Sequence, residues 1–167
     1  MSDFKSIETT VNPQQIDASS STQKVALGHI IRAKDWASTA YGVGEFIYLK
    51  GVASTVVGSV VHYNADDFST TLAVADGKGP IAVAMSACVA NEFGWYQIQG
   101  KGAAKVKAGF ADDGDCYLTS TAGSVDDANV AGDWVYGMKG ASAIDTPSTG
   151  LAEVELSRPM SNDGADD

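Results

Sequence analysis

Apolar and small side chains alternate with a period of two at the start of residues 79–108, GPIAVAMSACVANEFGWYQIQGKGAAKVKA. One set of alternate positions holds Ile81, Val83 and Met85, and the other holds Ala82, Ala84 and Ser86. A pleated strand with two different faces produces this pattern. Because the alanine face is narrow, we expect another sheet or another chain to approach it closely.

Two further strands are predicted in the same stretch. Asn91 and Gly94 tolerate a positive φ and indicate a turn, after which residues 95–99 alternate again. The glycines of residues 100–102 predict a second turn, and residues 104–108 form the third strand. The stretch is therefore a predicted β-meander without reaction chemistry.

Short strands separated by turn residues continue through the rest of the chain. They are predicted from about residue 25 to residue 33 and at residues 45–50, 59–63, 70–74, 115–119, 132–137 and 151–156, with Pro159 ending the last one. Only residues 86–91 suggest a helix, for one turn at most. About ten short strands with regular turn signals predict an all-β fold, a compact β-sandwich or β-barrel.

The polarity of the chain suggests three segments. Residues 1–24 are polar and predict a flexible N-terminal arm, either disordered or ordered along a neighbouring subunit. Its only apolar anchors are Phe4, Ile7, Val11 and Ile16, and its deletion is expected to leave the folded core intact. Residues 25–160 form one β-rich domain, and residues 161–167 form an acidic, disordered tail.

The charge balance narrows the class of partner. The 167 residues carry a formal net charge of −10, with a sequence pI of about 4.4. An acidic surface repels phosphate, which argues against nucleic acid and against an anionic membrane, and it favours a partner with basic patches. With no signal peptide and no bilayer-spanning apolar segment, we expect a protein made in a cytoplasm and used there or carried out within a larger assembly.

Cysteine and histidine are few and scattered. Cys88 and Cys116 fit no metal-binding spacing and are predicted to be reduced, buried thiols, with a disulfide or a surface thiol as the alternative. His29 and His62 lie in strand patterns without a nucleophile in a recognisable elbow beside them. We therefore predict no enzyme activity, no cofactor and no metal site.

The acidic turns and the aromatic side chains each allow a functional interpretation besides a structural one. Asp112, Asp113 and Asp115 match a calcium loop poorly, and a hydrolase that uses the Asp clusters is the enzymatic alternative. The tryptophans, together with the tyrosines, either fill a core or subunit interface, which we favour, or line a sugar-binding face. They are Trp36, Trp95 and Trp134.

Four stretches of the chain resemble small head proteins of tailed bacteriophages. They are GEFIYLKGVASTVVGSVVHYN (residues 44–64), GPIAVAMSACVANEFGWYQIQGKGAAKV (79–106), DDGDCYLTSTAGSV (112–125) and GLAEVELSRP (150–159). The family consists of the capsid decoration, or cement, proteins, which sit on the outside of the shell beside the major capsid protein. The resemblance covers about residues 25–160.

This resemblance implies a compact β fold, no enzymatic activity, and attachment to the outer capsid surface of the virion, often as a trimer. The expected partners are the major capsid protein and further copies of the chain in a homotrimer, with neither nucleic acid nor membrane. The family supplies no binding residues position by position. From the residues themselves, the candidate interface is Phe4, Ile7, Val11, Ile16, Trp95, Tyr96 and Trp134. The alternative is a head-fibre or adhesion module whose aromatic side chains bind a host-surface glycan.

Overall fold

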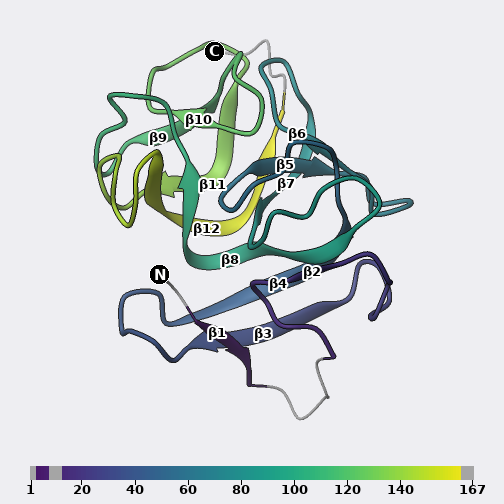
Figure 1. The fold of residues 1–167 in the computed structure, drawn as a ribbon. Helices are drawn as coiled ribbons and strands as arrows, with labels where there is room; N and C mark the ends of the chain where they lie inside the picture. Colours follow the sequence, from purple (N-terminus) through teal and green to yellow (C-terminus); the bar gives the residue numbers. More distant parts are fainter. Residues whose placement is uncertain (1–2, 8–12, 163–167) are drawn as a thin grey trace.

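The computed structural model describes residues 3–7 and 13–162, and every regular element in these ranges is a β-strand (Figure 1). The strands are β1 (Phe4–Ser6), β2 (Ser19–Ser20), β3 (Ile30–Asp35), β4 (Val43–Lys50), β5 (Val60–Tyr63), β6 (Thr70–Leu72), β7 (Gly79–Ala84), β8 (Phe93–Lys105), β9 (Asp115–Leu118), β10 (Val125–Asp126), β11 (Trp134–Gly140) and β12 (Leu151–Ser161). The predicted all-β class is confirmed. The helical turn suggested at residues 86–91 does not form.

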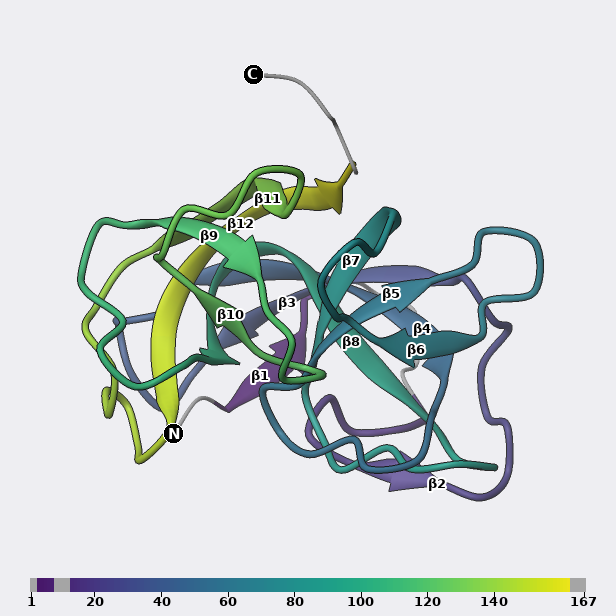
Figure 2. The same ribbon diagram turned by 90° about the horizontal axis from the view of Figure 1, so that it is seen from above.

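The strands belong to one curled sheet with the order β1-β3-β4-β8-β7-β12-β11-β9-β10, to which β2, β5 and β6 attach. The long strand β8 is central, because β4 pairs along one edge while β7 and β12 share the other. In both views β9 to β12 lie at one end of the molecule and β5 to β7 at the other (Figure 1, Figure 2). Strands β1, β3 and β4 form a layer below β8 in Figure 1. The arrangement is sandwich-like.

The curled sheet encloses three apolar clusters, and β7 contributes to two of them. Ile81 and Val83 enter the cluster at the β9–β12 end, whereas Ala82 and Ala84 enter the cluster between β4, β5, β7 and β8. The alternation predicted for this strand is therefore confirmed. The alanine face packs against the chain's own side chains, Ile98 among them.

The turn predicted at residues 100–102 is wrong, because β8 continues through it as one strand of 13 residues. The glycines instead let β8 bend where its pairing passes from β4 to β12. Gly100 has a φ of +93°, and a Cβ on it would lie 2.6 Å from the carbonyl oxygen of Val43. A Cβ on Gly102 would lie 2.2 Å from Oε1 of Gln97. Glycine here permits close approach of neighbouring atoms rather than chain reversal.

Parts of the N-terminal segment pack on the domain, so residues 1–24 do not form the wholly free arm that was predicted. Strand β1 pairs with β3 at the edge of the sheet. Phe4 is buried, and its ring meets that of Phe46 edge-on at 4.8 Å between centroids. An apolar side chain in an otherwise polar segment thus suffices to cover one end of a core cluster.

Gln14 fastens the next part of this segment. Its Nε2 donates hydrogen bonds to the carbonyls of Ala18 (2.8 Å) and Phe93 (2.9 Å), and its Oε1 accepts one from the Tyr48 hydroxyl (2.6 Å). The side chain is 5% exposed, and Ile16 beside it is 2% exposed. Buried polar groups of this kind are tolerated because they are hydrogen-bonded.

Several other predicted strand boundaries differ from the observed ones. The last strand runs through Pro159 to Ser161, because its pairing with β11 is irregular there and Arg158 takes a φ of +47°. The first predicted strand begins only at Ile30. Strands β1, β2 and β10 were not predicted, since each has two or three residues. Of the predicted tail at residues 161–167, Ser161 belongs to β12 and residues 163–167 lie outside the described part.

Candidate binding surfaces

The predicted interface residues do not form one surface. Phe4, Ile16, Trp95 and Tyr96 are buried, Ile7 and Trp134 are exposed at 44% and 42%, and Val11 lies outside the described residues. Side chains enclosed by their own domain cannot contact another subunit without unfolding. Of these seven residues, Trp134 belongs to an exposed aromatic surface.

Trp95 and Tyr96 are core residues for a clear physical reason. Both are fully buried in β8, on opposite faces of the strand. The indole Nε1–H of Trp95 donates to the Gln14 carbonyl at 3.1 Å, and its ring packs edge-on against Tyr48 at 5.0 Å. Burial, followed by the neighbouring Cys88, raises the pKa of the Tyr96 hydroxyl far above its ordinary value.

An exposed aromatic face lies on the outside of β9, β11 and β12. Trp134 and Tyr136 point outward from β11, with ring centroids 4.2 Å apart and planes tilted by 42°. Across the sheet, Trp134 pairs with half-buried Tyr117 and Tyr136 pairs with exposed Met160. We call Tyr117, Trp134, Tyr136 and Met160 the aromatic face. Met160 was missed, and Tyr136 was considered only among the tyrosines as a group, although the spacing of two between Trp134 and Tyr136 is the signal for a shared face.

Charged side chains continue this surface along the same strands. Lys139 of β11 pairs with Asp115 of β9 on one side and with Glu155 of β12 on the other, and all three are exposed. Together with Trp134 they line a shallow hollow of about 360 Å³. We call Asp115, Lys139 and Glu155 the charged row.

A second hollow, of about 450 Å³, opens between the N-terminal layer and the central strands. Its apolar lining includes Val57, Ala84, Met85, Gly102, Ala103 and Leu151, and we call it the aliphatic hollow. Tyr41 and exposed Asp17 complete it from the N-terminal layer. Sequence reasoning did not find this site, because its residues come from segments far apart in the chain.

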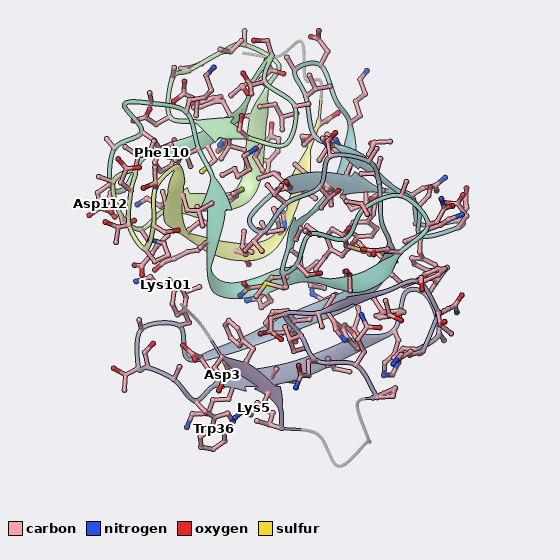
Figure 3. The ribbon with its side chains drawn as sticks, in the orientation of Figure 1. Asp3, Lys5, Trp36, Lys101, Phe110 and Asp112 are labelled. Atoms are coloured by element: carbon pink, nitrogen blue, oxygen red, sulfur yellow. The ribbon has the colours of Figure 1, made fainter. Side chains whose placement is uncertain are left out.

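Tyr41 is held rigidly at this hollow. Burial, and then the Glu153 carboxylate that its hydroxyl hydrogen-bonds, raise the pKa of Tyr41 to about 12. Glu153 also pairs with Lys101, whose Nζ lies 2.7 Å from the carboxylate. Lys101 lies at the side of the molecule where the N-terminal layer meets the upper strands (Figure 3). Tyr41 therefore stays neutral and oriented at ordinary pH.

The structure joins His62 to a serine 99 positions away, a pairing that local sequence reasoning cannot find. His62 Nε2 lies 2.6 Å from Ser161 Oγ, beside a hollow of about 430 Å³ that His62 lines. Ser161 is 1% exposed, and its hydroxyl donates to the Gly77 carbonyl at 2.8 Å. With that proton directed at Gly77, the imidazole donates to Ser161, and burial lowers the pKa of His62. The pair therefore ties the end of β12 to β5 and is not an activated nucleophile.

The two cysteines are free and buried, as predicted. Burial raises the pKa of the Cys88 thiol to about 11 and that of Cys116 to about 12, so both stay protonated and unreactive at neutral pH. Within residues 3–7 and 13–162, no group of three or more His, Cys, Asp or Glu side chains is placed to hold a metal ion. The described residues also contain no helix long and apolar enough to cross a membrane.

Compared with models of known protein families, with curated proteins and with solved structures, the chain matches none of them. The surfaces that the fold offers to a partner are the aromatic face, the charged row and the aliphatic hollow.

Proposed function

We propose that this chain is a structural virion protein that binds the outer surface of a phage capsid and stabilises the lattice of the major capsid protein. The observation that carries the proposal is the aliphatic hollow. Six of its lining residues, Val57, Ala84, Met85, Gly102, Ala103 and Leu151, come from three of the four stretches that resemble decoration proteins. The stretches that carry the resemblance thus converge in the fold on one concave apolar surface.

Such a surface suits docking of a protein side chain. Val57 is 44% exposed at the hollow, and covering what remains of it contributes about 1 kcal/mol per contact. Exposed Asp17 beside it, on a chain of net charge −10, favours an apolar side chain flanked by Lys or Arg. A weak contact is adequate when it is repeated at every lattice position, because many copies act together.

The homotrimer is part of this proposal and rests on the resemblance. Size-exclusion chromatography with light scattering on the purified full chain measures it directly. A monomer at the concentration that decorates capsids would remove the trimer from the proposal and leave capsid binding to be tested separately.

The proposal is tested on virions and on capsids that lack this protein. Quantitative mass spectrometry of purified virions should count about one copy per capsid subunit, and absence from virions would overturn the proposal. Val57→Asp should weaken binding to bare capsids at least tenfold, because it places a carboxylate in an apolar contact. Val74→Asp is the matched control, since Val74 is 40% exposed and does not line the hollow. Equal loss in both variants would exclude the aliphatic hollow as the docking surface.

A further inference from the structure

We infer that the outer face of β9, β11 and β12 is a second binding site, and that it takes a neutral glycan. The site consists of the aromatic face and the adjoining charged row, and Trp134 together with that row lines the shallow hollow. It shares no lining residue with the aliphatic hollow. The inference is therefore independent of capsid binding.

The aromatic half supplies a stacking platform. Trp134 and Tyr136 are 42% and 41% exposed although each has a large apolar ring, and Met160 beside Tyr136 is 51% exposed. Large exposed apolar side chains gathered at one place mark an interaction surface. The ring centroids are only 4.2 Å apart and the planes are tilted by 42°, so the two rings pack on each other and the seat for a ligand is the outer side of this pair. A pyranose ring suits this seat, because its faces carry C–H groups that pack on aromatic faces.

The charged row supplies polar groups at the edge of that seat. Asp115, Lys139 and Glu155 alternate in sign across three neighbouring strands. None of these three side chains forms an ion pair or hydrogen bond with another of the residues that the structure describes. Carboxylates accept and an ammonium group donates, so the row matches hydroxyls, which do both. A sugar presents hydroxyls around the edge of its apolar ring.

The charge of the chain selects the class of glycan. Asp115 and Glu155 in the row, with the overall charge of −10, repel uronic and sialic acids. The ligand is therefore a neutral pyranoside, and β-linked sugars with equatorial hydroxyls expose the most C–H surface to an aromatic ring.

The platform is preorganised by the core beneath it. Val135 and Met138, which alternate with the outward side chains of β11, are buried in the cluster at the β9–β12 end. The strand is also paired on both edges, with β9 and β12. A rigid site loses little conformational entropy on binding.

The test uses the full chain and two defined probes, β-1,4-linked oligomers of glucose and of N-acetylglucosamine, followed by isothermal titration calorimetry. We expect millimolar or tighter binding of at least one probe, quenching or shift of tryptophan fluorescence, and no change in affinity with added salt, because the ligand is uncharged. Absence of binding to both probes at millimolar concentration would overturn the inference.

Variants show whether binding occurs at this face. Trp134→Ala and Tyr136→Ala should each weaken binding at least tenfold. Trp36→Ala should leave it unchanged, since Trp36 is 59% exposed but lies on the N-terminal layer, far from β11 (Figure 3). Circular dichroism and thermal unfolding establish that each variant is folded. If Trp134→Ala instead abolishes trimer formation or capsid binding and spares glycan binding, the face is a protein interface and the glycan assignment is wrong.

Discussion

Gly102 and Gln97 are in close contact in the bend of β8. Replacing Gly102 with alanine should destabilise the fold through one interaction, the clash of the new methyl group with the Gln97 side chain. The three atoms nearest to a Cβ on Gly102 all belong to Gln97, at 2.2, 3.0 and 3.4 Å. Gln97 is fully buried, so its side chain cannot move into solvent. Its Nε2 donates to the carbonyls of Gln99 (3.1 Å) and Lys101 (3.0 Å). A methyl group on residue 102 must therefore displace a hydrogen-bonded amide.

The magnitude follows from those two hydrogen bonds. Each contributes about 0.5–1.5 kcal/mol net, and leaving a buried group unpaired costs about 1–3 kcal/mol. We therefore expect Gly102→Ala to lower the free energy of unfolding by about 2–4 kcal/mol. In a Gln97→Ala background the obstructing atoms are gone, and alanine in a strand is favoured over glycine by roughly 0.5–1 kcal/mol. The same substitution should then be neutral or stabilising, giving a coupling energy of about 3 kcal/mol between the two positions.

Urea unfolding of the four proteins in this cycle measures the coupling. Fluorescence of Trp95, which is fully buried, reports loss of the core, and the linear dependence on urea gives each free energy. A Gly102→Ala penalty of the same size in both backgrounds would refute the reasoning. It would mean that the cost arises from the backbone of residue 102 and not from Gln97.

Two further predictions concern the N-terminal segment and the thiols. Deleting residues 1–24 removes the buried side chains of Phe4 and Ile16, worth about 3–6 kcal/mol together, so thermal unfolding should show severe destabilisation; an unchanged midpoint would mean that the segment is dispensable. Cys88 and Cys116 should resist a thiol reagent at about pH 8 in the folded chain and react fully in urea. Since both folded pKa values are raised, the thiols' contribution to stability is complete below about pH 9 and is lost as the pH rises toward 12. In a Cys88→Ala/Cys116→Ala variant, the free energy of unfolding should therefore fall less steeply over this pH range than in the unmodified chain.

The strands that could be predicted are those whose two faces differ in the sequence itself. Ile81 and Val83 alternate with Ala82 and Ala84, and the two sets enter different clusters as alternation requires. The glycines at residues 100–102 led to the wrong prediction of a turn, because glycine occurs both in turns and where neighbouring atoms approach the backbone closely. Only the neighbours of Gly102, which come from folding, distinguish the two uses.

The binding surfaces could be predicted less well, because exposure depends on which strand faces are covered. Trp95 and Trp134 both stand in short aromatic strand patterns, yet the first is fully buried and the second is 42% exposed. Trp95 packs in the cluster that includes Ile16 and Tyr48, and its indole N–H donates to the carbonyl of Gln14. A polar residue in a polar segment gave no sign that this segment covers β8. The aliphatic hollow was equally hidden, since Val57 and Leu151 meet only in the fold.

Strand β12 connects the two proposed binding sites physically. Leu151 at its start lines the aliphatic hollow, and Met160 near its end belongs to the aromatic face. Nine residue steps separate them along the strand, roughly 30 Å at the usual rise. Because β12 is paired with β8, β7 and β11, the two sites are held at a fixed separation. If both proposals hold, every decorated lattice position presents a glycan site, and weak single contacts add up to strong attachment of the whole particle.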